Sequence, residues 1–158
     1  MCKYLLTFLI ATSLFVNANS QTKEVWMFGP MLHFNFGNKE VHTSIGIELS
    51  YWNYTHFPYS VDFGIDFERK KSRLYSEVQT GIGILGISAG PVIELNRYEH
   101  KLMAGFQGSL WGNYFGGFDL RYRKMGGNSY ISPGGYFKLP MGYEGDSDGD
   151  SHHFDWDD

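Results

Sequence analysis

The sequence contains almost no cysteine, since Cys2 is the only one among 158 residues. It lies before the apolar run of residues 5–16, whereas the lipid-modified cysteine of a lipoprotein follows such a run. A mature chain that begins at Gln21, after a cleaved signal peptide, would have no thiol. This excludes a disulfide framework, a zinc–thiolate site and a cysteine nucleophile.

A long apolar run is also missing. Residues 5–16 form a run of about 12 residues, too short to cross a bilayer as a helix. Lys3 precedes this run, and small residues follow it at Ala18 and Ser20. The pattern predicts a secretory signal peptide over residues 1–20, cleaved before Gln21. The alternative is a buried N-terminal helix, but the downstream sequence offers it no helical partner.

Charge is sparse, and the net charge is only −4. This balance argues against non-specific nucleic-acid binding. The sequence also lacks a phosphate-binding loop, a dinucleotide fingerprint and a metal triad, so it predicts no cofactor and no metal. Glycine and aromatic residues are abundant instead, with 20 glycines and 18% aromatics.

Apolar and polar residues alternate with period two in eight segments of roughly ten residues, the length of a tilted strand that crosses a bilayer. The eighth segment is interrupted at residues 133–135. Pro30, Pro91 and Pro133 each remove a ladder donor, so we expect bulges or strand ends there. A tight turn is expected at Leu85–Gly86. The segments lie at about residues 25–36, 41–51, 59–67, 73–84, 87–95, 101–111, 114–123 and 129–139.

This pattern predicts an all-β fold, an eight-stranded antiparallel up-and-down transmembrane β-barrel over residues 21–143. Residues 144–158 form an acidic tail that we predict to be disordered. Asp146, Asp148 and Asp150 resemble the start of a calcium loop, but Ser151 and Asp157 occupy its glycine and glutamate positions. We therefore interpret the tail as solvated; His152 and His153 would at most bind a metal weakly.

Three features suggest that the apolar face meets lipid and the polar face lines the lumen. The polar face is rich in glycine and carboxylates and lacks lysine, as expected of a narrow interior filled by side chains. Basic residues gather around the odd-numbered turns, which share one rim. This predicted basic rim comprises Lys39, Arg69, Lys70, Lys71, Arg73, Arg97, Lys101, Arg123 and Lys124.

The third feature is an aromatic girdle at the opposite rim, as expected at a membrane interface. The predicted aromatic belt comprises Trp26, Trp52, Tyr54, Trp111 and Tyr114.

Charged residues on the polar face form a predicted lumen network of Glu48, Asp62, Asp66, Glu77, Glu94, Asp119 and Arg121. Such a cluster fits either an ion or proton pathway or a polar plug. We favour the plug, because eight strands leave little lumen and unpaired buried charge is costly.

The pattern over about residues 25–139 resembles the small eight-stranded outer-membrane barrels of the outer-membrane protein A and X type. The chain departs from that pattern at its end, where an acidic tail follows the last strand. The resemblance implies a Gram-negative outer-membrane location and a basic rim facing lipopolysaccharide. The short turns favour a non-enzymatic role, as a structural protein or as an accessory subunit of a larger envelope complex.

Two other functions remain open at this stage. A soluble secreted lipocalin-like barrel would bind an apolar ligand in a cavity lined by Ile45, Ile47, Phe63 and Ile65. A lipid A or phospholipid acyl hydrolase or transferase would need a serine–histidine site, for which the sequence offers His33, His42 and Ser44. No G-x-S-x-G context supports the enzyme.

Overall fold

The computed structural model describes residues 24–37, 40–54 and 57–141. The predicted signal peptide, the predicted acidic tail and Lys39 lie outside the described residues. No helix in the described part of the chain is long and apolar enough to cross a membrane.

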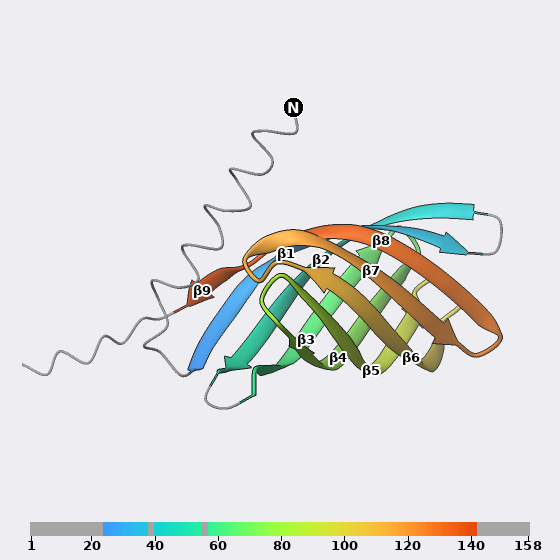
Figure 1. The fold of residues 1–158 in the computed structure, drawn as a ribbon. Coiled ribbons are helices and arrows are strands. Elements are labelled where there is room, and N and C mark those ends of the chain that lie inside the picture. Colours follow the sequence, from blue (N-terminus) through green and yellow to red (C-terminus); the bar gives the residue numbers. More distant parts are fainter. Residues whose placement is uncertain (1–23, 38–39, 55–56, 142–158) are drawn as a thin grey trace, which may run out of the picture.

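Eight long strands, each paired antiparallel with its neighbours in the chain, close into a barrel (Figure 1). The predicted eight-stranded antiparallel up-and-down barrel is therefore confirmed. The strands are β1 Glu24–Gly37, β2 Glu40–Asn53, β3 Tyr59–Glu68, β4 Lys71–Gly81, β5 Leu85–Asn96, β6 Lys101–Gly112, β7 Gly116–Met125 and β8 Asn128–Phe137, followed by the short β9 Leu139–Met141.

The barrel closes because β8 and β9 together act as one last strand along β1. Leu32 faces Gly135 in β8, and Phe28 faces Leu139 in β9, so the register does not change between them. Lys138 lies between the two segments, and its backbone N–H donates to the Phe115 carbonyl at 2.6 Å. Within the described strands, closure pairs both edges of the sheet, which removes the usual route to edge-to-edge aggregation.

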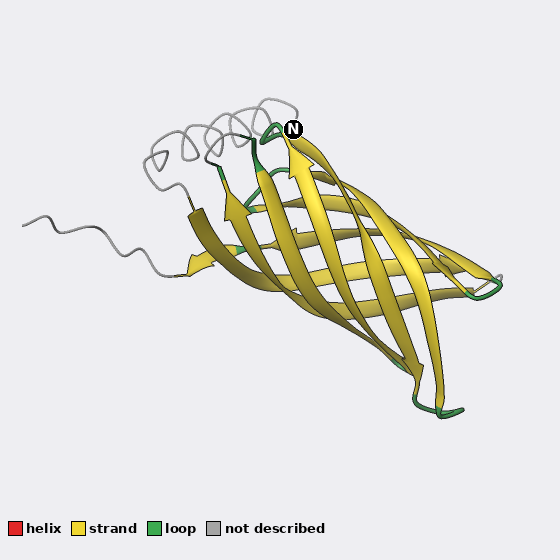
Figure 2. Ribbon diagram, turned by 90° about the horizontal axis from the view of Figure 1, so that it is seen from below, coloured by secondary structure: helices red, strands yellow, loops and turns green. Residues whose placement is uncertain are grey.

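The strands tilt strongly around the barrel (Figure 2). Following the pairing once around from Trp26 leads back to β1 at Phe36, ten residues further along. A stagger of this size on eight strands corresponds to a tilt of about 40–45°. The path runs through Tyr51, Val61, Val78, Ala89, Gly108, Tyr122 and Ile131.

Two local expectations were wrong. Pro30, Pro91 and Pro133 lie inside strands whose register continues past them, so they mark neither bulges nor strand ends. The turn expected at Leu85–Gly86 lies earlier, between the end of β4 at Gly81 and the start of β5 at Leu85. It needs Gly83, whose φ of 88° is strained for residues with a Cβ.

Turns β1–β2, β3–β4, β5–β6 and β7–β8 share one end of the barrel, which we call the odd-turn end. The other three turns lie at the even-turn end, together with the start of β1 and the end of β9, where Trp26 faces Met141. An even number of strands has this consequence for any up-and-down barrel.

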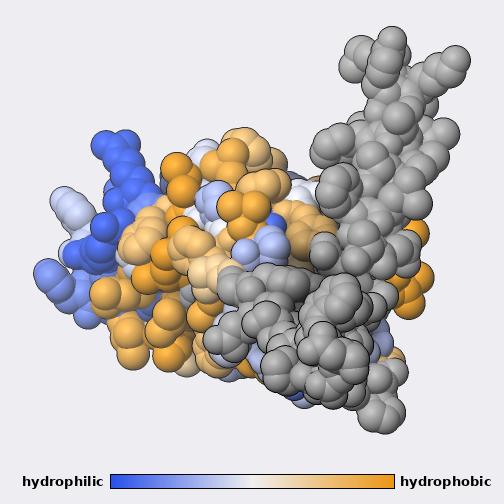
Figure 3. Space-filling view, turned by 90° about the vertical axis from the view of Figure 1, so that its left-hand side faces the viewer, coloured by the Kyte–Doolittle hydropathy of each residue, from blue (hydrophilic) through white to orange (hydrophobic). Residues whose placement is uncertain are grey.

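Inner and outer faces alternate along every strand, and the apolar face is outside. Ile45 is 62% exposed and Phe63 is 53% exposed, whereas Asp62 and Asp66 are buried inside. Apolar residues cover much of the barrel side, and hydrophilic residues gather at one end (Figure 3). The cavity expected of a lipocalin-like barrel is contradicted, because Ile45, Ile47 and Phe63 point away from the interior.

Candidate functional site

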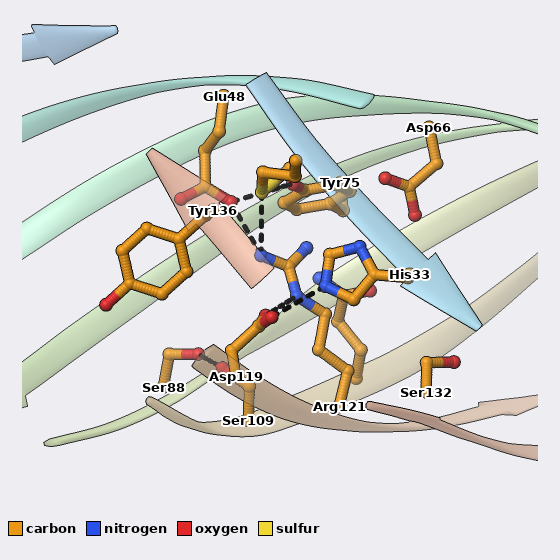
Figure 4. Close-up of polar contacts among 12 residues, drawn as sticks. His33, Glu48, Asp66, Tyr75, Ser88, Ser109, Asp119, Arg121, Ser132 and Tyr136 are labelled. Atoms are coloured by element: carbon orange, nitrogen blue, oxygen red, sulfur yellow. Dashed lines mark hydrogen bonds and ion pairs between the residues drawn. The ribbon is translucent and has the colours of Figure 1, made fainter. Parts of the chain in front are cut away.

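Many charged and polar side chains of the described residues are buried in the lumen, and several of them are drawn in Figure 4. All seven residues of the predicted lumen network are buried there. They come from β2, β3, β4, β5 and β7, and the closed sheet brings them together: Glu48, Asp62, Asp66, Glu77, Glu94, Asp119 and Arg121.

Arg121 is the centre of this set (Figure 4). Its guanidinium pairs with Glu48 at 2.9 Å and with Asp119, and it lies 4.7 Å from the centroid of the Tyr75 ring. Tyr75 donates to Glu48 at 2.7 Å, and His33 bonds Asp119 at 2.8 Å. The cluster thus joins β1, β2, β4 and β7 across the lumen.

Two arginines assigned to the basic rim are lumen residues instead. Arg73 pairs with Glu68 at 2.7 Å and Glu94 at 2.8 Å, and it is almost fully buried. Arg123 pairs with Asp66 and donates to Gln107 at 2.7 Å. Both occupy inward-facing positions in the alternation of their strands. They are therefore buried although they lie near a turn.

Lys71, also assigned to the rim, is half-buried just inside the odd-turn end. It pairs with Glu94 at 3.0 Å and donates to the Tyr130 hydroxyl at 3.1 Å. Its ammonium therefore belongs to the ion pairs of the lumen, at the odd-turn end, and is not a free cation of the rim.

Lys138 corrects the expectation that the polar face lacks lysine. It lies between β8 and β9, points inward, pairs with Glu48 and donates to the Ser50 hydroxyl at 2.8 Å. Its Nζ is also 3.6 Å from Asp62. The period-two pattern beyond residues 133–135 places Lys138 on the inward face, and this was the signal available in the sequence.

Among the described buried carboxylates, Glu77 is the only one without an ion pair. Six others have one, namely Glu48, Asp62, Asp66, Glu68, Glu94 and Asp119. Glu77 is 2% exposed, and one of its carboxylate oxygens has no hydrogen-bond partner among the described residues. It is therefore the point in the network where a charge is least compensated.

Aromatic side chains fill the even-turn end of the lumen. Trp52 is only 2% exposed; its ring centroid lies 4.6 Å from that of Tyr114 and 5.6 Å from that of Trp111. Tyr54 stacks on Trp52 at 5.6 Å. The prediction that Trp52, Tyr54, Trp111 and Tyr114 belong to an outward-facing aromatic belt is therefore wrong. We call these four residues the aromatic plug.

Trp26 is the member of the predicted belt that does face outward. It is 46% exposed and lies 4.9 Å from the ring centroid of Tyr51. Trp52 and Trp111 share the inward parity of Ser50 and Ser109, so alternation alone would have placed them inside.

Five predicted rim cations do lie exposed at the odd-turn end: Arg69, Lys70, Arg97, Lys101 and Lys124. A polar cavity of about 280 Å³ opens beside two of them, Arg69 and Lys70; its other lining residues are Gly37, Glu40, His42, Glu68, Lys71 and Tyr130.

The serine and histidine residues considered for catalysis have separate partners. His42 bonds Glu40 at 2.9 Å on the rim, whereas Ser44 accepts a hydrogen bond from Asn35 at 3.0 Å in the interior. His33 is buried against Asp119. The structure does not bring His42 and Ser44 into a nucleophile–base contact of the kind that acyl transfer needs.

Comparisons with known proteins support the fold. No family model matches the chain, and no curated protein matches it. A solved structure from work on the de novo design of transmembrane β-barrels matches with a TM-score of 0.50 and 9% identity, over 75% of this chain and 98% of that one. The solution NMR structure of the de novo designed protein TMB2.3 matches with a TM-score of 0.52 and 10% identity over the same shares.

A third structure, the attachment invasion locus protein Ail of Yersinia pestis, aligns over 73% of this chain and 97% of that one at 11% identity. Its TM-score of 0.35 is too low to establish a common fold. The two designed proteins therefore carry the comparison, and the chain has the fold of a transmembrane β-barrel.

Proposed function

We propose that this protein is a small outer-membrane β-barrel of a Gram-negative envelope that acts without catalysis, as a structural protein or as an accessory subunit of a larger complex. Its odd-turn rim meets the phosphate-rich leaflet of lipopolysaccharide. The observation that carries the proposal is the combination of an apolar outer face with an interior of paired charges. Soluble barrels have the reverse arrangement.

The filled lumen supports a non-transporting role. Arg73 and Arg121 each bridge carboxylates from two strands, and Arg123 pairs with Asp66. The aromatic plug occupies the even-turn end. Side chains of this size fill an eight-stranded barrel, which is too narrow to hold a channel beside them.

The rim supports a contact with anionic lipid. Arg69, Lys70, Arg97, Lys101 and Lys124 are exposed at the end opposite to the chain termini of the described barrel. A chain delivered from the periplasm leaves its termini on that side, so the cations face the outer leaflet. Lysine and arginine at a charged membrane surface each contribute on the order of 1 kcal/mol.

Fractionation tests the location. The processed protein is expected in the outer-membrane fraction, released only by detergent, and its unboiled form should migrate differently from the boiled form on a denaturing gel. Recovery of the processed protein entirely in soluble periplasm would overturn the proposal.

A pair of rim variants tests the lipid contact. Replacing Arg69 and Lys70 by alanine should reduce the lipopolysaccharide that copurifies with the barrel, whereas the same-rim change Glu99→Gln should not. Equal amounts of copurified lipopolysaccharide in all three proteins would contradict the proposed role of the rim.

A further inference from the structure

The seam between β1 and the last strand is the place where backbone pairing is least complete. The pairing is interrupted twice within the described strands, opposite Pro30 and opposite Pro133. On the far sides of the same two strands, the β1–β2 and β7–β8 pairings run through both prolines without a gap. Both prolines therefore direct their missing N–H toward the seam.

Each gap leaves one carbonyl without its ladder donor. The register places Phe137 opposite Pro30 and Phe34 opposite Pro133, so the Phe137 and Phe34 carbonyls lose the bond that a proline cannot donate. Pro91 interrupts the β4–β5 pairing in the same way, opposite Ser76. In hydrocarbon an unpaired carbonyl is costly, because no water can reach it.

Two of these three carbonyls lie directly against the Cα of the glycine that precedes the proline in the facing strand. A Cβ built on Gly29 would overlap the Phe137 carbonyl oxygen, and one built on Gly90 would overlap the Ser76 carbonyl oxygen. The absence of a side chain lets each carbonyl approach a Cα–H group, which is a weak donor.

Ser132 stands before Pro133, in the position that glycine occupies at the other two gaps. Its hydroxyl donates to Asn35 at 2.7 Å. The Phe34 carbonyl therefore has neither the prolyl donor nor the glycine contact that the Phe137 and Ser76 carbonyls have.

An apolar groove lies over this seam on the outside of the barrel. It has a volume of about 750 Å³, and Phe34 and Pro133 are among its lining residues. Gly135 is an outward-facing residue without a side chain, and Leu32 and Phe137 stand beside it. The groove is continuous with the apolar band that faces lipid.

We propose that this seam groove binds a lipid whose acyl chain carries a hydrogen-bond donor, an amide N–H or a chain hydroxyl, which donates to the Phe34 carbonyl. Ester-linked chains have acceptors only and cannot satisfy a carbonyl. Phe34 lies three residues before the end of β1 at Gly37, so it is roughly 7 Å below the odd-turn end on a tilted strand. Amide and hydroxyl groups near the head of a lipid lie at this kind of depth.

Competition between two lipids tests the proposal with the purified barrel in nanodiscs. One lipid carries an amide-linked 3-hydroxyacyl chain, and the other is a diester with equal chain length and the same head group. The lipids retained by the barrel are counted by native mass spectrometry. We expect roughly five- to tenfold enrichment of the amide lipid, the effect of one hydrogen bond in a membrane.

Pro133→Ala restores the N–H opposite Phe34 and should bring the enrichment close to one. Pro91→Ala is the matched control, since it restores a donor away from the groove and should leave the enrichment unchanged. Gly135→Val fills the groove from the outside and should lower retention of the amide lipid; Gly108→Val, on the outer face of β6, should not.

Equal retention of the two lipids by the native barrel would overturn the proposal, and so would full enrichment in Pro133→Ala. The assay uses defined lipids and no lipopolysaccharide. Its outcome is therefore independent of the rim contact and of the location of the protein in the cell.

Discussion

The two ends of the lumen are filled by different chemistry. Toward the odd-turn end, arginines and carboxylates from opposite strands form ion pairs around Arg73, Arg121 and Arg123. At the even-turn end, Trp52 packs edge to face against Trp111 and Tyr114 and stacks on Tyr54, without ion pairs among these residues.

This difference separates two ways of stabilising a narrow barrel. An ion pair inside the lumen holds two strands at a fixed distance. When one partner is removed, the other is left as an unpaired buried charge, which destabilises the barrel. Aromatic rings fill volume without leaving a charge behind. The two ends should therefore respond differently to the loss of one side chain.

The largest effect is expected in the ionic part. Arg121→Met leaves Asp119 and Glu48 without their shared guanidinium, and it should lower the free energy of unfolding by about 3–5 kcal/mol. Urea titration of the barrel in vesicles, followed by tryptophan fluorescence, measures the change. Adding Glu48→Gln to this variant should recover part of the loss; a loss below about 1 kcal/mol in Arg121→Met would show that the pairing is not stabilising.

A smaller loss is expected in the aromatic plug. Trp52→Ala removes the ring that contacts Tyr54, Trp111 and Tyr114, and it should cost about 3 kcal/mol. Water can enter this end of the barrel and no charge is left unpaired, so the loss should not depend on salt. The same titration at low and high ionic strength checks this.

The aromatic plug variant also tests closure of the lumen. Trp52→Ala should produce no ion current in a planar bilayer, because the ionic part still fills the rest of the lumen. Steady channel activity in this variant would show that the aromatic plug alone closes the barrel.

Glu77 should behave unlike the paired carboxylates around it. Glu77→Gln removes a buried charge that has no ion pair in the described structure, so the free energy of unfolding should stay constant or rise by up to about 1 kcal/mol. Asp66→Asn, which breaks a pair with Arg123, should instead lower it. The same sign for both variants in the urea titration would contradict the pairing described here.

The smallest effect on stability is expected at the rim. Replacing Arg69 and Lys70 by alanine should change the free energy of unfolding by less than about 0.5 kcal/mol, because exposed charges are screened by water and salt. A large loss in the unfolding assay would mean that these side chains hold the β3–β4 turn in place.

The alternation of apolar and polar residues predicts most of the fold from the sequence. Lipid outside and a filled lumen inside impose a strict period of two on every strand. The parity of a residue decides which face it takes, even where the residue lies near a turn. Arg73 and Arg123 were assigned to the rim, and Trp52 and Trp111 to the belt, although all four share the parity of inward residues.

Other features depend on contacts between distant strands and could not be read from local pattern. The partners of Arg121 lie on β2 as well as β7, and only the stagger of the closed sheet brings Glu48 to it. Likewise, the gaps at Pro30 and Pro133 fall on the same seam because β1 begins the barrel and β8 ends it. Tyr114 lies in the turn between β6 and β7 and not in a strand, because β7 begins later than expected, at Gly116.

The central claim is that the apolar face meets lipid and the charged face lines the lumen. The mature chain is expected to lack cysteine, so single cysteines can be placed in turn at positions 61 to 66 and spin-labelled in vesicles. Labels replacing Val61, Phe63 and Ile65 should collide with oxygen dissolved in lipid, and labels replacing Asp62, Gly64 and Asp66 should not. The opposite alternation, or none, would contradict the account.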